Sequence, residues 1–326
     1  METEQPKGAL DGVRVLDLSH GIAGPFAARL LGDFGADVIK IEKPGTGDFA
    51  RFLEPLKSDA PAPEQSLLFQ YLNWNKRSVA LDLRTPGARP VMKRLVEATD
   101  IVIESFRPGT LDGWGLGVDQ MLEWNPRVVV TSVTNFGQTG PYASCRASDL
   151  VLQAMSGIMQ ISGRVDREPL KHGLSQSYFC AGLNAAYASL VAYTAAAADG
   201  IGEHVDLSIH ECLASELVLN EPYYAFLGAV QGRRAAVQDP FSGEPLPARK
   251  GFLAIQTGGG AAFENYADLF EREEFRDPAF ASRAQRERRA QEVRALLQEC
   301  LAHRDAKEVF LKGAQRRLLV GVVQGA

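Results

Sequence analysis

The sequence predicts an α/β fold in which a Rossmann-like parallel sheet is followed by a second, smaller α+β domain. Short apolar runs alternate with helix-length segments up to about residue 220, an alternation that is typical of a parallel sheet covered by helices. A turn with two glycines and a proline joins the first strand to the first helix. After Asn220 the chain becomes polar and proline-rich, then strongly charged, which indicates a change of domain.

The opening unit, residues 11–43, is predicted to be a βαβ motif. Residues 13–18 are almost continuously apolar, as expected of a strand buried in a parallel sheet. The proline that closes the next turn suits the first turn of a helix, and Gly35 is placed to end that helix. A second strand is expected at residues 37–42.

The turn at residues 20–25 directs backbone N–H groups and a helix N-terminus toward one point, which favours an anion such as phosphate. It is not a dinucleotide fingerprint, because Gly21 and Gly24 are not followed by the third glycine of GxGxxG. The turn alone therefore fits either a ligand loop or a tight structural corner.

The rest of the first domain continues the alternation. Residues 44–66, rich in Pro, Gly, Asp and Ser, are expected to form a long surface loop. Thr85 as N-cap and Pro86 at the first helical position predict a helix that ends at Glu97. Further strands are expected at 78–83, 100–105, 127–133 and 202–209, and further helices at 118–124, 148–161, from near 178, and from 210.

The second domain is expected to begin near residue 222, so that residues 1–221 form the large domain and residues 222–326 the small one. Residues 229–250 are interpreted as a linker, 251–256 as a strand and the remainder as charged helix. The arginine-rich run at 283–294 includes glutamates at helical spacing, which indicates a solvated helix with i,i+4 pairs. Gly258–Gly260 is interpreted as a turn between strand and helix.

The composition is that of a soluble globular protein, with 45% hydrophobic and 23% charged residues. A net charge of -5 argues against a general nucleic-acid-binding protein. The four cysteines form no CxxC pair and the five histidines no HxH or HExxH motif, so no metal site is expected. Scattered cysteines and the absence of an apolar leader or of 18 consecutive apolar residues predict a cytoplasmic protein with no membrane association.

Three stretches carry a family resemblance. They are VLDLSHGIAGPFAARLLGDFGADVIKIEKPGTGD at 15–48, NWNKRSVALDLRTPGARPVMKRLVEATDIVIESFRPGTLDGWGL at 73–116 and NPRVVVTSVTNFGQTGPYASCRASDLVLQAMSG at 125–157. They resemble the family III CoA-transferases, which include formyl-CoA transferases and, as relatives, α-methylacyl-CoA racemases. The resemblance fades after about Glu221. It implies a CoA-binding domain and an interlocked dimer.

The resemblance also implies that CoA lies over the C-terminal edge of the sheet. The family positions that contact CoA correspond here to Ile22, Ala23, Lys43, Leu81, Arg84, Ser105, Phe106 and Arg107. All follow the ends of the first four strands, and parallel strands end at one edge of a sheet. The alternative is that Lys43, Arg84 and Arg107 are solvated surface cations.

The resemblance further implies an aspartate nucleophile before the long helix, whose carboxylate attacks the thioester. The corresponding stretch here is LSQSYFCAGL, in which Tyr178 occupies the aspartate position. No acidic residue occurs between Glu168 and Asp199. A phenol with a pKa of about 10 is a poor substitute for a carboxylate, so Tyr178 is expected to be inactive as a nucleophile.

Asp149 is the remaining acidic candidate, at a secondary acidic position of the family. A helix N-cap at Asp149 or Ser148 is an equally good interpretation of this position. Racemase relatives carry a histidine just before this acid, and Ser148 stands there instead. Racemisation by a His/Asp pair is therefore disfavoured.

Three functions stay open on the sequence. The chain is the non-catalytic subunit of a heteromeric CoA-transferase, an active CoA-transferase that uses another residue such as Asp149, or a pseudoenzyme that binds CoA esters. The expected partners are an acyl-CoA, a carboxylic acid acceptor, and either an aspartate-bearing homologous subunit or a second copy of the chain. CoA is then a substrate, and no cofactor is expected. Because family chains continue past this point, the small domain is expected to be incomplete at its C-terminus.

Overall fold

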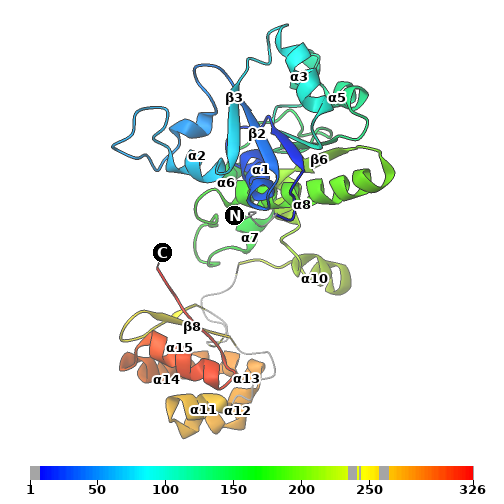
Figure 1. Cartoon of the computed structure of the whole chain (residues 1–326). Helices are drawn as coiled ribbons and strands as arrows, with labels where there is room; N and C mark the ends of the chain where they lie inside the picture. Colours follow the sequence, from blue (N-terminus) through cyan, green and yellow to red (C-terminus); the bar gives the residue numbers. More distant parts are fainter. Residues whose placement is uncertain (1–7, 234–240, 242–243, 257–263, 326) are drawn as a thin grey trace. The chain divides into compact units, whose positions relative to one another are not determined.

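The computed structural model describes residues 8–233, 241, 244–256 and 264–325. The chain divides into two compact units (Figure 1). Unit 1 comprises Met1–Ser162 and Pro169–Gln231, and unit 2 comprises Gly163–Glu168 and Gly232–Ala326. The α/β fold predicted from the sequence, with a parallel sheet followed by a smaller α+β region, is confirmed.

Unit 1 is built on a six-stranded parallel sheet in the order β3-β2-β1-β4-β5-β6. Its strands are β1 (Arg14–Asp17), β2 (Asp37–Glu42), β3 (Lys76–Ala80), β4 (Ile101–Glu104), β5 (Val129–Thr134) and β6 (His204–Ser208). Successive side chains alternate between the two faces. Val15 therefore packs into one buried cluster and Leu16 into another, on opposite faces of the sheet.

Helices cover both faces of this sheet. The cluster that contains Val15 also includes residues of α1 (Ala23–Asp33) and α8 (Gln176–Asp199), and the cluster that contains Leu16 includes residues of α3 (Ala88–Glu97) and α5 (Val118–Trp124). The other helical segments of unit 1 are η1 (Phe49–Phe52), α2 (Leu67–Leu72), α4 (Thr110–Gly113), α6 (Asp149–Met155), α7 (Ile158–Ile161), α9 (Ile209–Ala214) and α10 (Asn220–Leu227).

In the part of the chain that the structure describes, one helix, α8, is long and apolar enough to cross a membrane by length and composition alone. Ala181, Ala185 and Ala192 are buried on one face of it, where the helix packs against α1 and β5. The small side chains of this face allow close approach to these neighbours, whereas Leu183, Tyr187 and Val191 of the same helix are exposed.

Unit 2 has a three-stranded antiparallel sheet in the order β7-β8-β9. The strands are β7 (Leu246–Pro247), β8 (Phe252–Gln256) and β9 (Leu319–Val322). The helical segments are α11 (Asn265–Phe270), η2 (Glu273–Arg276), α12 (Pro278–Ala281), α13 (Arg283–Arg288), α14 (Ala290–Ala302) and α15 (Ala306–Gln315). Aromatic and aliphatic side chains fill its core, among them Phe270, Phe275 and Leu297.

The structure corrects several predicted elements. The third strand begins two residues earlier than residue 78 and ends at Ala80. Thr85 does not cap α3, which begins at Ala88 after Gly87; its hydroxyl instead donates to the Asp82 carbonyl at 2.9 Å. The helix expected at 148–161 is broken at Gly157, whose φ of +91° is left-handed.

Two more corrections concern segments whose secondary structure was predicted wrongly. The end of the chain, predicted as helix, forms strand β9 paired with β8. The expected loop at 44–66 contains the short helix η1, capped by the Asp48 side chain. The turn predicted at Gly258–Gly260 lies outside the described residues.

Candidate functional site

The strand order places a crevice at the carboxyl ends of β1 and β4. These two strands are neighbours, but the chain leaves them toward opposite sides of the sheet, and ligands of open α/β sheets bind at such a switch point. A cavity of about 580 Å³ lies there, within unit 1. Seven of the ten residues singled out from the sequence line it: Ile22, Ala23, Ser105, Phe106, Arg107, Asp149 and Tyr178.

The other three predicted residues, Lys43, Leu81 and Arg84, line a second cavity of about 150 Å³. His20 and Phe106 line both cavities, so the two adjoin. Arg84 is already paired, with its Nη2 at 2.7 Å from Asp82 Oδ2. The Lys43 side chain, in contrast, forms no hydrogen bond or ion pair with a described residue.

The turn after β1 is held in place from two sides. Gly21 has a φ of +79°, a conformation that glycine adopts without steric cost. Its backbone N–H donates to Asp48 Oδ1 at 2.9 Å, and the N–H of His20 donates to Ser105 Oγ at 2.9 Å. Burial lowers the pKa of His20 below its ordinary value. The wall of the larger cavity is thus fixed by contacts to segments far away in the sequence.

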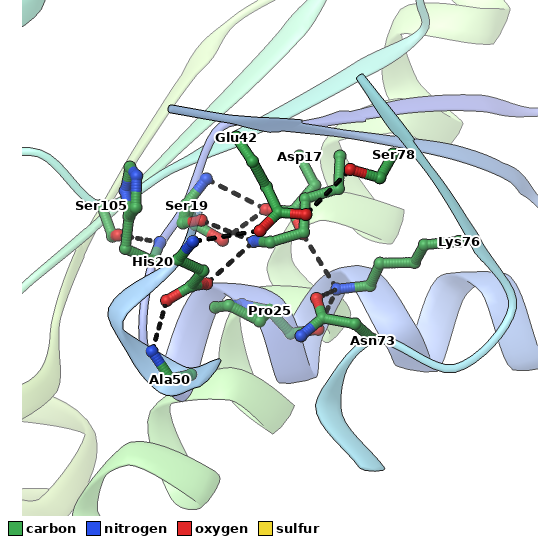
Figure 2. A network of polar contacts seen from close by, with 12 residues as sticks. Asp17, Ser19, His20, Pro25, Glu42, Ala50, Asn73, Lys76, Ser78 and Ser105 are labelled. Carbon is green, nitrogen blue, oxygen red and sulfur yellow. Dashed lines mark hydrogen bonds and ion pairs between the residues drawn. The ribbon is translucent and has the colours of Figure 1, made fainter. Parts of the chain in front are cut away.

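A network of fully buried charges lies beneath this turn (Figure 2). Lys40 Nζ lies 3.4 Å from Asp17 Oδ2 and 3.1 Å from Asp48 Oδ2, and donates to the Ser19 carbonyl at 2.8 Å. Lys76 Nζ lies 2.9 Å from Asp17 Oδ2. Asp17 also accepts hydrogen bonds from the backbone N–H and the hydroxyl of Ser19. Two carboxylates and two ammonium groups therefore compensate one another inside the protein.

Burial and mutual attraction act against each other in this network. Burial disfavours the charge on Asp17, but Lys40 and Lys76 outweigh it and hold the pKa of that carboxyl below its usual range. Burial also disfavours the charge on Lys40, yet Asp17 and Asp48 raise its pKa. For Lys76, burial prevails and lowers the pKa to about 8. Lys40 is therefore the firmly charged centre of the network.

Glu42 extends the network to the segment that forms another wall of the cavity. Its carboxylate accepts from Arg51 Nε at 2.8 Å, from the Asp48 N–H at 3.0 Å and from Ser78 Oγ at 2.8 Å. Burial opposes the charge on Glu42, but these donors lower its pKa to about 2. They fix η1, whose Phe49 lines the larger cavity.

Glu104, at the end of β4, is a buried acid next to the cavity. Its Oε2 accepts from the Phe106 N–H at 2.7 Å, and its side chain also bonds Ser132. Burial outweighs both hydrogen bonds and raises the pKa of Glu104 to about 7. Residues 105–107, which follow β4, are therefore hydrogen-bonded to a carboxyl group whose pKa lies near neutral pH.

Asp149 and Tyr178 both line the larger cavity. The Asp149 carboxylate accepts from Lys171 Nζ at 2.8 Å, from the Ser177 N–H at 3.1 Å and from Gln153 Nε2 at 3.1 Å. Burial opposes its charge, but these donors lower its pKa. Burial, with the neighbouring charge of Asp149, raises the pKa of Tyr178 further.

Among the residues that line the larger cavity and were not predicted as site residues are His20, Thr134 and Arg146. Thr134 ends β5 and His20 lies three residues after the end of β1, positions near strand ends that could have identified them. Arg146 follows no strand, and only the fold brings its segment to the cavity.

Comparison with known proteins identifies the family. A model of CoA-transferase family III matches residues 10–326. The chain is 40% identical over 233 residues to succinyl-CoA–D-citramalate CoA-transferase of Chloroflexus aurantiacus, covering 72% of this chain and 57% of that protein. It is 36% identical over 238 residues to the succinyl-CoA–L-malate CoA-transferase beta subunit of the same organism, with the same two coverages. The chain thus spans less than two thirds of the length of these curated relatives.

A solved structure agrees with the family match. The crystal structure of a CAIB/BAIF family protein from Brucella suis superimposes with a TM-score of 0.86 at 31% identity. The superposition covers 98% of this chain and 85% of the Brucella chain. The similarity in structure therefore extends over both units, beyond the part in which the sequence resemblance was visible.

Proposed function

Because the chain belongs to CoA-transferase family III, we propose that it binds an acyl-CoA at the carboxyl edge of its parallel sheet and takes part in transfer of CoA to a carboxylic acid. We propose further that it is the non-catalytic chain of a heteromeric enzyme, in which a homologous subunit supplies the aspartate nucleophile. The four free cysteines are consistent with a cytoplasmic location.

The observation that carries this proposal is the chemistry of the larger cavity. Its one acidic side chain among the described lining residues, Asp149, is held by Lys171, Gln153 and the N–H of Ser177. Burial opposes the charge of Asp149, but these donors lower its pKa, and with it the basicity that a carboxylate nucleophile needs. The pKa of Tyr178 is raised, so its phenolate is even less available. The cavity is suited to holding a thioester, but among its described lining residues it offers no unpaired carboxylate to attack one.

The comparison also supports a heteromeric assembly. One relative, the succinyl-CoA–L-malate CoA-transferase beta subunit of Chloroflexus aurantiacus, is by its name a subunit. That relative is 36% identical to this chain, and we extend its subunit organisation to this chain as part of the proposal. We therefore favour the heteromer over a pseudoenzyme that binds CoA esters without taking part in their chemistry.

CoA binding is the first test. CoA or acetyl-CoA is expected to stabilise the chain by about 2.7 kcal/mol at a hundredfold excess over Kd, whereas NAD is not, because the turn lacks the dinucleotide fingerprint. Lys43→Ala is expected to reduce the shift in Tm. Lys93→Ala is the matched control, since Lys93 lies on α3 and pairs with Glu97. A folded chain that responds to no CoA species would contradict the proposal.

Covalent labelling is the second test. The isolated chain is incubated with a panel of acyl-CoA esters, quenched with hydroxylamine and digested for mass spectrometry. We expect no hydroxamate on the isolated chain, because a tyrosine cannot form the mixed anhydride. Mixing with an aspartate-bearing homologue is expected to produce a hydroxamate on the homologue and to start CoA exchange.

The labelled peptide distinguishes the alternatives. A hydroxamate at Asp149 of the isolated chain would identify an active transferase and refute the non-catalytic role. Binding of CoA without transfer, alone and with every homologue of the same host, would instead identify a pseudoenzyme. Tyr178→Asp is expected to recover at most trace exchange, because the shorter side chain leaves a gap beside the thioester.

A further inference from the structure

Two acidic side chains are buried at strand ends beside the cavities, Glu42 at the end of β2 and Glu104 at the end of β4. Arg51 neutralises Glu42, with its Nε and Nη2 at 2.8 and 2.9 Å from the two carboxylate oxygens. Glu104 is 3% exposed and forms no ion pair with any residue in the described part of the chain. A buried carboxyl group without a counterion favours its neutral form, so Glu104, unlike Glu42, can exchange a proton near neutral pH.

The groups around Glu104 act in the same direction. Burial raises the pKa of Glu104 to about 7, helped by the negative charges of Asp112 on α4 and Asp206 on β6. The cation of the adjoining segment, Arg107, is exposed to solvent. The elements β1, α3 and α5 supply apolar side chains to the face of the sheet that Glu104 shares with Val102, among them Leu16, Met92 and Met121. These neighbours oppose the ionisation of Glu104.

Hydrogen bonds connect Glu104 to the cavity wall on one side and to the surface on the other. Its Oε2 accepts the N–H of Phe106 at 2.7 Å, and its side chain also bonds Ser132. The Oγ of Ser132 lies 2.9 Å from Nε2 of His204, which is exposed on the edge strand β6. A hydroxyl group and a neutral imidazole can each donate and accept. The hydrogen bonds can therefore run outward from a protonated Glu104, or inward from His204 to an ionised Glu104.

Protonation of Glu104 preserves its contact with the cavity wall. In a neutral carboxyl group one oxygen accepts the Phe106 N–H, and the other carries the proton that is donated to Ser132. Loss of this proton reverses the second hydrogen bond and adds a negative charge behind residues 105–107. Phe106 lines both cavities, and its ring lies 5.1 Å from that of His20, which also lines both. The two states of Glu104 thus differ in charge, not in contacts, behind a segment that borders both cavities.

We propose that Glu104 is a positioning residue for CoA: as a neutral acid it holds residues 105–107 in place through the Phe106 N–H, and binding of CoA is accompanied by uptake of a proton. This inference rests on the proposed function, since it requires a CoA species in the cavities. The phosphates of CoA are anionic, and an ionised carboxylate buried behind the same segment would repel them where charge is weakly screened. Because ligand and proton favour each other, the affinity is expected to fall as Glu104 ionises.

The test is calorimetry of acetyl-CoA binding to the full chain at about pH 6 and about pH 8.5, on either side of the titration of Glu104. Glu104→Gln reproduces the neutral acid, because its amide oxygen can accept from the Phe106 N–H and its amide N–H can donate to Ser132. Equal affinity of wild type and variant is expected at the lower pH. At the higher pH the wild type is expected to bind about threefold more weakly than the variant, as a rise of about half a pKa unit on binding predicts. The ratio of the two Kd values removes the titration of the phosphate of acetyl-CoA itself.

Proton uptake is a readout that a merely structural role would not change. The heat of binding near neutral pH, measured in two buffers that differ in their heat of ionisation, gives the number of protons taken up. This number is expected to be larger for the wild type than for Glu104→Gln. Ser132→Ala removes a hydrogen bond that favours the ionised carboxylate, so the fall in affinity is expected to move to higher pH in this variant.

Glu123→Gln is the matched control, because Glu123 is an exposed acid on α5. It is expected to behave as the wild type at both pH values. Equal pH profiles or equal proton numbers for wild type and Glu104→Gln, equal weakening by this variant at both pH values, or an unshifted profile of Ser132→Ala would overturn the inference while CoA binding stands. Failure of the wild type to bind acetyl-CoA at either pH would overturn the proposed function, and this inference with it.

Discussion

Unit 1 buries Asp17, Lys40 and Lys76 beneath its first turn, whereas unit 2 fills its core with side chains such as Phe270 and Phe275. In the described part of unit 2 the buried charged residue is Arg286, and its Nη1 donates to the Phe280 carbonyl. The other charged residues in the described part of unit 2 lie at least partly in solvent.

This difference between the units indicates which part of the chain requires a fixed conformation. Removing two ions from water costs more than their attraction returns unless every remaining hydrogen bond is made. The network of unit 1 comes near to this condition: Asp48 Oδ2 accepts no hydrogen bond from a described residue but lies 3.1 Å from Lys40 Nζ. Its other partners include the Ser19 carbonyl and the Gly21 N–H, in the turn beside the cavity. Unit 2 has the ordinary arrangement of a globular domain, with apolar side chains in its core. The arginine-rich run predicted as one solvated helix is divided between α13 and α14, and its Arg286 is buried. The expected i,i+4 pairing is present, with Arg283 and Glu287 2.9 Å apart.

The largest expected effect comes from Lys40→Met, which keeps the approximate volume and removes the central charge. Asp17 and Asp48 are then left buried without their shared cation, and we expect a loss of about 3–5 kcal/mol in the free energy of unfolding. Urea denaturation followed by tryptophan fluorescence measures it selectively, because all three tryptophans of the chain (Trp74, Trp114 and Trp124) lie in unit 1. A loss below about 1 kcal/mol would show that the network does not hold unit 1 together.

Much of the fold was predictable because the signals are local. Continuous apolar runs and punctuating glycines and prolines gave β2 at Asp37–Glu42 and α5 at Val118–Trp124 with the correct bounds. The capping of α3 and strand β9 could not be predicted in this way. Thr85 is drawn into a bond with the Asp82 carbonyl, and β9 is extended because it pairs with β8, a partner more than sixty residues away.

The candidate site was predictable as far as strand ends identify it. Residues such as Ile22 and Arg107 follow strands, so the sheet edge gathers them without further information. The sequence could not show that Lys40 and Lys76 share Asp17, because alternation in a strand does not reveal which polar residue faces a buried partner. The sequence also could not show that Arg146 lines the cavity, because its position depends on how α6, which follows it, packs.

A smaller, pH-dependent effect is expected at Glu104. Burial raises its pKa from 4.5 to about 7, so the folded chain retains a proton that the unfolded chain releases. Its contribution to stability is full below about pH 4.5 and is lost as the pH rises through about 7, a change on the order of 3 kcal/mol. Glu104→Gln cannot titrate, so its stability is expected to fall less over this range. Urea denaturation at several pH values measures this, and parallel profiles would contradict it.

The smallest effect is expected from Lys312→Met, the same exchange as at Lys40 but made in unit 2. Lys312 Nζ lies 2.8 Å from Glu308 Oε1 on α15, a shorter contact than either ion pair of Lys40. Both side chains are more than half exposed, at 56% and 55%. Water therefore solvates each charge when the other is removed, and no group is left buried and unpaired. We expect the thermal midpoint, followed by far-UV circular dichroism, to change by no more than about 2 °C. A loss as large as that of Lys40→Met would mean that short ion-pair distance, rather than burial, determines the stability of both units, and the contrast drawn between them would fail.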